Sequence, residues 1–464
     1  MRGRSNRQAI ARPLSSALPM SVSLPFVLCV LFLVVLWIAG GASRGDVLGQ
    51  VVVRGAAWMC LCLAALFGRR PTFGSTWPLA LFLSLALALT LIQLVPLPPS
   101  MWQALPGRAL LTQAAEVMGE AQPWRPISMV PDATRNAAAS LVVPFTMLVL
   151  MASMRGAERS WLPGVLLGLI GASALLALLQ FSGSRINNPL INDTVGQISA
   201  SFANRNHLAL FLAIGCVLAP AWAFLNPHGR QWRVIAALGM LLLFILMILA
   251  TGSRAGLLLG GLALVAATAM VWNDVRRLMR RYPRWVLGAS GAVTAGVIGI
   301  AVLATVAANR AISINRILAG DATEDMRSRA LPTVIDMIRT YFPVGSGLGG
   351  FDPIFRIHEP RHLLKLTYFN HAHNDLLEVA VDAGLAGTLL LLGAVGWWGY
   401  LTLRAWRGGA GATLPRLGSV ILGLMLVASV FDYPARTPMI MAVLVIAAWW
   451  LSDRSPRAGD TLRT

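Results

Sequence analysis

Long blocks of apolar residues alternate with short polar connections along most of the chain. Each block approaches the roughly 20 residues that an α-helix needs to cross a bilayer, and the last two blocks are somewhat shorter. The blocks lie at 22–40, 47–67, 77–95, 137–153, 161–181, 207–225, 234–251, 255–272, 286–308, 383–403, 417–431 and 438–451. This pattern predicts an all-α polytopic membrane protein with about twelve transmembrane helices.

The composition agrees with this interpretation, and the distribution of charge predicts the orientation of the chain in the membrane. Of the 464 residues, 56% are hydrophobic and 12% are charged, whereas a soluble chain carries about 25% charged residues. The net charge of +19 could indicate nucleic acid, an anionic substrate or membrane topology. When the basic N-terminus 1–21 is placed in the cytoplasm, most of the arginine excess falls on the short inner connections, as the positive-inside rule demands. Both termini, including the tail 452–464, are therefore expected inside, and no nucleic-acid partner is needed.

Three longer segments fall on the outer side, at 96–136, 182–206 and 309–374. The third separates helices 1–9 (22–308) from helices 10–12 (375–451). It is expected to contain a helix over 332–342, because a proline suits the first turn. One face of this helix would be apolar and would lie flat at the outer interface. That face contains Leu331, Val334, Ile335, Ile338, Tyr341 and Phe342.

Polar residues gather at the outer ends of the predicted spans. The motifs are SFANRNH (201–207), TGSRAG (251–256), DMRSRA (325–330), NHAHNDLLEVAVDAG (370–384) and FDYPARTP (431–438). A topology derived from charge alone puts all five on one side of the membrane. This convergence predicts a single outward-facing site.

Some of these residues have simpler explanations. An arginine near a helix end commonly extends its charge to the interface, and this is the first interpretation for Arg54, with anion binding second. His207 is equally well explained as an ordinary helix-end histidine. The GSGLGG stretch (345–350) follows a helix instead of opening one, which favours a turn over a phosphate cradle. Arg254 lies in a tight turn between two spans, and this position favours a functional role.

Two histidines, His371 and His373, precede the tenth span. Metal binding is disfavoured because their spacing puts the two rings on opposite faces of a strand and far apart on a helix. If a helix begins near Asn374, then Asn374, Glu378 and Asp382 share one face and would orient an imidazole above them. A histidine held in this way can act as a general base near neutral pH.

Several arginines beside one histidine indicate an anionic donor. The planar guanidinium fork binds phosphate through paired, charge-assisted hydrogen bonds. If a diphosphate is the leaving group, arginines can stabilise the charge that develops on it. The residues alone lead to an outward-facing transferase acting on a lipid phosphate, and an anion transporter fits the same arginines almost as well.

The motifs resemble those of the O-antigen ligase and Wzy-type polysaccharide polymerase-like membrane family. The similar stretches are FANRNHLA (202–209), TGSRAGLL (251–258), RSRALPTVIDMI (327–338), PVGSGLGGF (343–351), HAHNDLLEVAVDAGLAG (371–387) and FDYPARTP (431–438), and QLVPLPPSMWQALPGR (93–108) looks like an early outer loop of one branch. The resemblance extends over most of the chain, and the histidine motif is its most specific part.

This resemblance implies a GT-C-like glycosyltransferase in the bacterial inner membrane, with a large periplasmic loop that contains short helices. The implied donor is an undecaprenyl-diphosphate-linked oligosaccharide, transferred by inversion to a hydroxyl acceptor on a glycan, on lipid A-core or on a protein. Membrane lipids and a chain-length regulator protein are further partners that it implies, and no cofactor or metal is expected. Polymerisation is favoured over ligation, and a transporter of a small anion such as bicarbonate is the alternative.

The resemblance also assigns roles to residues. His373, in His-Asn-Asp, looks like the catalytic histidine, and Arg254 looks like the arginine that follows a serine at a span end. The second arginine is Arg327 or Arg329, because the usual tryptophan that fixes the register is replaced by Leu331 or Pro332. The residues expected to bind substrate are His371, Asn374, Arg205, Asn204, Asn206, Arg436, Asp432 and Glu378.

Overall fold

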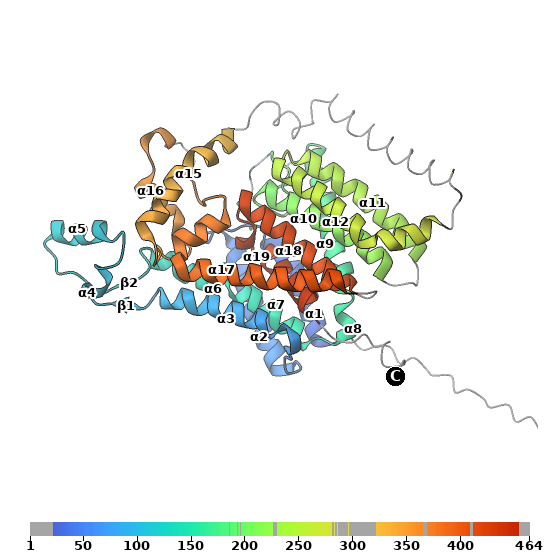
Figure 1. The fold of residues 1–464 in the computed structure, drawn as a ribbon, viewed down its shortest axis with the longest axis horizontal. Helices are drawn as coiled ribbons and strands as arrows, with labels where there is room; N and C mark the ends of the chain where they lie inside the picture. Colours follow the sequence, from blue (N-terminus) through green and yellow to red (C-terminus); the bar gives the residue numbers. More distant parts are fainter. Residues whose placement is uncertain are drawn as a thin grey trace, which may run out of the picture.

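The computed structural model describes residues 22–184, 186–192, 194, 196–225, 230–280, 283, 285, 296, 322–364, 369–408 and 412–453. Most of the predicted span 286–308, the N-terminus 1–21 and nearly all of the tail 452–464 lie outside the described residues. The described helices pack side by side in one bundle, and short elements gather at one end of it (Figure 1).

Nine helical segments of the described chain are long and apolar enough to cross a membrane, and two further apolar helices are shorter. The long segments are α2 (Leu48–Phe67), η1 with α3 (Gly74–Thr76, Trp77–Ile92), α6 with α7 (Pro131–Ser140, Val142–Ser153), α8 with α9 (Gly156–Arg159, Leu162–Phe181), α10 (Arg205–Leu225), α11 (Arg230–Ala250), α12 (Arg254–Met279), α17 (Asp375–Arg407) and α18 (Thr413–Phe431). The shorter helices are α1 (Leu24–Ala39) and α19 (Pro438–Ser452). Each predicted span within the described residues coincides with one of these helices. The chain is an all-α polytopic membrane protein.

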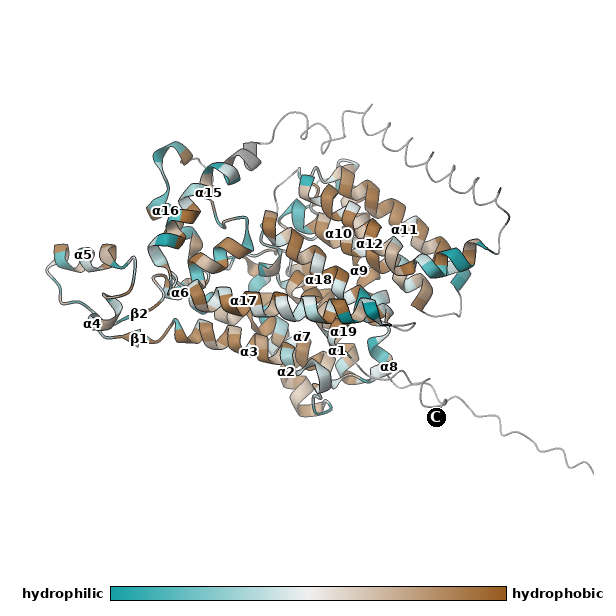
Figure 2. Ribbon diagram, in the orientation of Figure 1, coloured by the Kyte–Doolittle hydropathy of each residue, from teal (hydrophilic) through white to brown (hydrophobic). Residues whose placement is uncertain are grey.

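The centre of the bundle is α10, which contacts α9, α11, α12 and α18. Its side chains are buried on nearly every side, including Phe211, Ile214 and Val217. A helix that is apolar all round requires such a position. Hydrophobic residues cover the length of the bundle, and hydrophilic residues lie toward its two ends (Figure 2).

Helix α17 is broken near its beginning, where Gly384 has φ +56 and ψ −142. The break leaves helical carbonyl and amide groups without partners, and buried backbone groups need such partners. The glycine-rich turn 345–350 supplies two of them, because the amides of Ser346 and Gly347 donate to the carbonyls of Val381 and Asp382 at 2.9 Å each. The amide of Leu385 donates to the Pro343 carbonyl at 2.8 Å. The turn therefore completes the broken helix.

A two-stranded antiparallel sheet and several short helices lie at the end of the bundle where α17 begins (Figure 1). These elements are β1 (Pro96–Leu97) paired antiparallel with β2 (Arg125–Pro126), α4 (Pro99–Trp102), α5 (Ala109–Met118), α15 (Ala322–Tyr341), α16 (Phe351–His358) and η2 (Arg361–Leu363). They come from two of the three predicted outer segments, 96–136 and 309–374. The structure therefore gathers elements of both segments at one end.

Arg108 joins the segments 96–136 and 309–374. Its side chain is 2% exposed, and Nη2 donates to the carbonyls of Ile127 at 2.6 Å and Gly345 at 3.0 Å. Burial lowers the pKa of Arg108 to about 10, which still leaves the guanidinium charged at neutral pH. This contact ties the loop after α3 to the turn that completes α17.

One expectation for the predicted helix over 332–342 is wrong. Helix α15 begins at Ala322, so Pro332 lies inside it and not in its first turn. The predicted apolar face is divided, because Leu331, Ile335 and Phe342 are exposed while other residues are buried. Val334, Met337 and Tyr341 are buried against α16, α17 and the loop before α17. Part of the apolar stripe is thus a packing surface for the protein itself, and contact of the exposed part with the membrane interface stays a prediction.

Candidate active site

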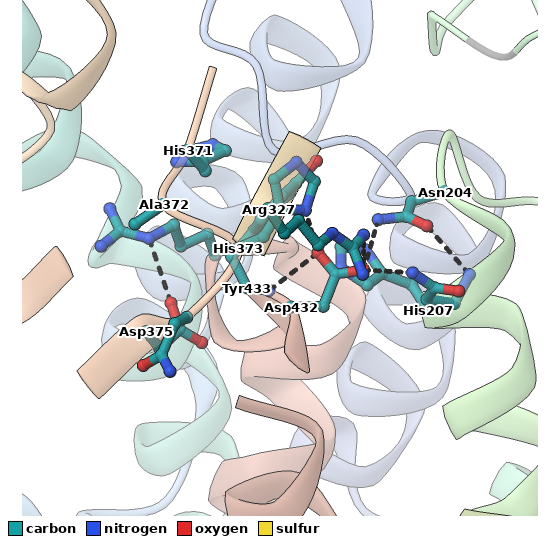
Figure 3. A network of polar contacts seen from close by, with 12 residues as sticks. Asn204, His207, Arg327, His371, Ala372, His373, Asp375, Asp432 and Tyr433 are labelled. Atoms are coloured by element: carbon teal, nitrogen blue, oxygen red, sulfur yellow. Dashed lines mark hydrogen bonds and ion pairs between the residues drawn. The ribbon is translucent and has the colours of Figure 1, made fainter. Parts of the chain in front are cut away.

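Asp432 is the centre of a polar network at the end of the bundle (Figure 3). It lies between α18 and α19, and its side chain is 4% exposed. Its Oδ2 accepts hydrogen bonds from Asn204 Nδ2 at 2.9 Å and Asn206 Nδ2 at 2.6 Å. Its Oδ1 lies 3.1 Å from Nδ1 of His373, and Oδ2 lies 3.7 Å from Nη2 of Arg327. One carboxylate therefore brings together three of the five predicted polar motifs with its own.

The fifth motif joins through a helix cap. Ser253 is the N-cap of α12, and its hydroxyl oxygen accepts from the Gly256 amide at 2.8 Å. The same hydroxyl donates to Oδ1 of Asn206 at 2.7 Å. Arg254 is the first residue of α12 and Arg205 is the first residue of α10, and both are half-buried. The bonds of Asn206 to Asp432 and to Ser253 thus place both arginines at the same end of the bundle as Asp432.

His373 is held by its backbone, by aromatic rings and by Asp432. Its φ of +50 is in the left-handed region, and its ring centre lies 5.2 Å from that of Phe369 and 5.0 Å from that of Tyr433. An Nδ1–H donated to Asp432 leaves the lone pair of the neutral ring on Nε2. The imidazole thereby has one nitrogen fixed by the protein and one available for a substrate.

Burial and charge act against each other on this pair. Burial lowers the pKa of His373, the hydrogen bond and charge of Asp432 raise it, and Arg327 lowers it again, so the net pKa is below its ordinary value. For Asp432, burial raises the pKa, but His373, His207 and Arg327 lower it more, and the net pKa is well below the ordinary range. At neutral pH the pair therefore consists of a neutral imidazole and a carboxylate.

His371 has a different partner. Its Nδ1 lies 2.8 Å from Oε1 of Glu378, whose Oε2 accepts from the Ala372 amide at 2.8 Å. The ring centre of Tyr433 lies 4.1 Å from that of His371. Glu378 thus orients His371, and His373 is oriented from another helix end. The expected shared orientation of one imidazole by Asn374, Glu378 and Asp382 is not what the structure shows.

Asn374 and Asp382, the other two residues of that face, bond to nearby backbone groups instead. Asn374 is the N-cap of α17, where Oδ1 accepts from the Leu377 amide at 3.1 Å and Nδ2 donates to the Val430 carbonyl at 3.1 Å. Asp382 accepts from the amide of Gly349 at 3.0 Å. Both residues therefore fix the start of α17 relative to its neighbours.

Arg436 is enclosed by three carboxylates of α17. Its Nε lies 3.2 Å from Asp375 Oδ1, and its Nη2 lies 3.2 Å from Glu378 Oε1. Its Nη1 lies 4.0 Å from Asp382 Oδ2, and the Ser429 hydroxyl donates to Asp375 at 3.0 Å. These contacts occupy most of the guanidinium. Arg436 is therefore placed to hold α17 on the loop before α19.

The structure separates the two candidate arginines of the loop helix. Arg327 is directed at Asp432, and its side chain is 26% exposed. Arg329, two residues on, donates from Nη2 to the carbonyl of His362 at 3.1 Å and lies at the surface. Of the two, Arg327 contacts the network around Asp432.

Tyr433 was not expected among the site residues, although it follows Asp432 in the FDYPARTP motif. Its ring packs against His371, His373 and His207, and the centroid distance to His207 is 5.2 Å. His207 itself is buried, with Nδ1 2.9 Å from Oγ1 of Thr437. An aromatic residue beside the aspartate of the FDYPARTP motif was the only signal in the sequence.

Within the described part of the chain, no group of three or more His, Cys, Asp or Glu side chains could hold a metal ion.

Residues 238–392 match the family model described as O-antigen ligase. The matched segment contains Arg254, Arg327 and His373, and it ends before Asp432. No curated protein matches the chain. Over this segment, about a third of the chain, the protein is similar to the O-antigen ligase family, whose description points to membrane proteins of polysaccharide biosynthesis.

Proposed function

We propose that the protein is an inner-membrane glycosyltransferase that uses an undecaprenyl-diphosphate-linked glycan as its donor. The acceptor is a hydroxyl group at the periplasmic face, with polymerisation favoured and ligation to lipid A-core or protein second. The observation that carries the proposal is the buried pair of His373 and Asp432, with Arg327 against the same carboxylate. This is the arrangement of an oriented general base beside a site for an anion.

The proposed chemistry is a single displacement. Nε2 of His373 takes the proton of the acceptor hydroxyl while the hydroxyl oxygen attacks the anomeric carbon of the donor sugar. The bond between that carbon and the diphosphate oxygen breaks, and the anomeric configuration inverts. Arg254 and Arg327 stabilise the negative charge that develops on the departing lipid diphosphate. Asp432 keeps Nδ1 protonated and stabilises the imidazolium that forms.

The position of the site favours a transferase over a small-anion transporter. Asn204, Arg254 and Asp375 stand at or just before the first residues of α10, α12 and α17, at one end of the bundle. Transporters of anions and ions hold their substrate near the bilayer midplane, in the interior of interrupted helices. Polar groups at the helix ends instead suit a substrate whose sugar lies outside the membrane.

The proposal is tested by the glycans that the protein makes. The gene is deleted in its own host and replaced by wild type, His373→Ala or Arg254→Ala, and lipid-linked glycans are separated by length. A polymerase variant should accumulate single-repeat carrier and lose polymer, whereas a ligase variant should accumulate long, unattached chains. Normal glycans from both variants, with each protein inserted at wild-type level, would refute the catalytic assignment.

A further inference from the structure

A groove of about 750 Å³ lies on the His371 side of the histidine motif. Its walls come chiefly from α3, α17, α18 and α19, and most of the lining is apolar. Representative lining residues are Phe82, Leu83, Leu390, Met425 and Leu444. Polar and charged side chains line one end, and the three aspartates among them are each paired with an arginine. These side chains are Arg44, Asp46, Arg54, Asn136, Asp352, His371, Asp375 and Arg436. The groove is therefore amphipathic along its length.

Its dimensions suit a chain and not a compact molecule. Along α17 the lining residues extend from Asp375 to Trp398, and the part from Ala383 to Trp398 alone corresponds to about 22 Å at the rise of an α-helix. Along α3 they extend from Leu79 to Thr90. A typical hydrocarbon core is about 30 Å thick, so the groove follows most of the depth of one bilayer. An occupant that fills it is long, thin and apolar.

Arg54 gives the polar end of the groove its charge. Its Nη2 donates to Oδ1 of Asn136 at 2.6 Å and to the Asn136 carbonyl at 3.4 Å. Its Nε is buried and has no hydrogen-bond partner among the described residues. Arg44, the other arginine at this end outside the α17 network, is paired with Asp46. A half-buried guanidinium with a donor unused in apolar surroundings fits a phosphate oxygen.

The groove and the network around Asp432 lie on two sides of one motif. His371 lines the groove, whereas the contacts of His373 are to Asp432 and to aromatic rings. Tyr433 packs against both imidazoles, and Figure 3 shows His371 and Asp375 on one side of Asp432 and Asn204 and His207 on the other. Two ligands could therefore approach the histidine motif from different directions.

We propose that this groove is a second lipid site, which holds the acceptor. An isoprenoid-type chain lies among the residues of α3 and α17, and its phosphate contacts Arg54. The attached sugar then reaches the histidine motif from the His371 side, opposite the donor diphosphate at Arg254 and Arg327. This inference rests on the proposed function, and it selects a lipid-linked sugar chain as the acceptor.

The test is photocrosslinking of the full-length protein in nanodiscs with a polyprenyl diphosphate that carries a photoreactive group in its chain. Digestion and mass spectrometry then locate the label. Wild type should be labelled on the segment of α3, Trp77–Ile92. Arg54→Gln should lower this label about tenfold, because one charge-assisted contact is lost. Leu83→Trp, which fills the groove without changing charge, should lower it as well.

The matched control is Arg135→Gln, which also removes one arginine near the outer end of the bundle. Arg135 is exposed and pairs with Asp132, so its loss should leave the label on α3 unchanged. An α3 label that either Arg54→Gln or Leu83→Trp leaves at the wild-type level would overturn the proposal. Equal competition by an uncharged polyprenol, or by inorganic diphosphate alone, would also overturn it.

The result is separable from the test of the proposed function. An α3 label that depends on Arg54, together with normal glycans from His373→Ala, supports the lipid site and refutes the catalytic assignment. Loss of glycan transfer in His373→Ala, together with an α3 label that does not depend on Arg54, refutes the lipid site alone. Melting temperatures of the variants in detergent establish that each compared protein is folded.

Discussion

Nδ1 of His373 lies 3.1 Å from Oδ1 of Asp432, a residue that follows it by 59 positions in the chain. The other oxygen of this carboxylate accepts hydrogen bonds from Asn204 and Asn206, so the aspartate cannot rotate without breaking them. The imidazole is thereby fixed by a group that is itself fixed from α10. Such a second layer of support is what a general base requires if its free nitrogen is to meet a substrate in one geometry.

Asp432→Asn should lower kcat by about 10²-fold to 10⁴-fold, as expected when a buried aspartate no longer sets the tautomer of a catalytic imidazole. The amide is nearly isosteric, so the loss arises from the charge and the acceptor and not from a cavity. The measurement is the rate of transfer from a purified lipid-linked donor to acceptor in detergent.

The control for this substitution is Asp336→Asn, which removes an exposed aspartate of α15 that pairs with Arg339. Surface ion pairs of this kind contribute only about 0–1 kcal/mol, and the control should retain wild-type rate. A folded Asp432→Asn protein that also retained wild-type rate would show that the aspartate does not support catalysis.

The rate should depend on pH through His373. Its pKa lies below its ordinary value of 6.5, first because of burial. A base acts only in its deprotonated form, so activity is lost when pH falls through this pKa, and the midpoint of the acid limb should lie below 6.5. Asp432 raises the pKa of His373, so in Asp432→Asn the residual activity should have its acid limb at still lower pH. Initial rates from pH 4 to 8 at saturating donor check both signs, and an acid limb above 6.5 would contradict them.

The sequence predicts the bundle well because each span carries its own signal. The apolar block over 47–67 becomes α2 (Leu48–Phe67) almost residue for residue. The helix predicted over 332–342 begins ten residues after the start of α15 at Ala322, because Pro332 has the pattern of a first-turn proline and yet lies inside the helix. Local periodicity shows which faces are apolar, but it does not distinguish a first-turn proline from an exposed proline inside a longer helix, as Pro332 is.

The candidate site was likewise only partly predictable from the sequence. Residue types, together with the topology derived from charge, predict that the five polar motifs lie at one end of the bundle. The pairing of His373 is long-range, however, and helical spacing directed attention to Glu378, which holds His371 instead. The spacing of residues along one helix cannot show which carboxylate bonds to His373, because Asp432 lies between two other helices, α18 and α19.

Arg327 and Arg329 offer a matched pair two residues apart. Arg327 lies against Asp432, and Arg329 contacts the carbonyl of His362 at the surface. Arg327→Ala should lower kcat by about 10²-fold to 10³-fold, which is typical when one donor to a developing anion is lost. Arg329→Ala should change the rate less than about threefold, since surface substitutions rarely have larger effects. Steady-state rates of both variants test this prediction. A larger loss of kcat in Arg329→Ala than in Arg327→Ala would assign the donor site to Arg329.

Arg436→Gln should destabilise the fold. The arginine lies within 4.0 Å of three carboxylates of α17, and its side chain is 20% exposed. Removing one partner of a buried ion pair costs about 3–5 kcal/mol, because the opposite charges remain without compensation. Arg339→Gln, which breaks an exposed pair on α15, is the matched control and should have the melting temperature of the wild type. Thermal unfolding in detergent provides the comparison, and equal melting temperatures for the two variants would show that the carboxylates need no buried cation.

Gly384→Ala should be more disruptive than its size suggests. Gly384 has φ +56, and a Cβ built there would lie 2.1 Å from the carbonyl oxygen of Pro343. Because the obstacle is backbone, no side chain can move to relieve it, and the glycine-rich turn would have to separate from the broken helix. Strain of this kind costs on the order of 1–3 kcal/mol at one residue before any lost hydrogen bonds are counted. Gly396→Ala in the same helix meets no atom within 4 Å, and alanine is favoured over glycine in a helix by about 1 kcal/mol. The two variants should therefore shift the melting temperature in opposite directions, and Gly384→Ala should also lose transfer activity, because the turn it displaces positions the start of α17.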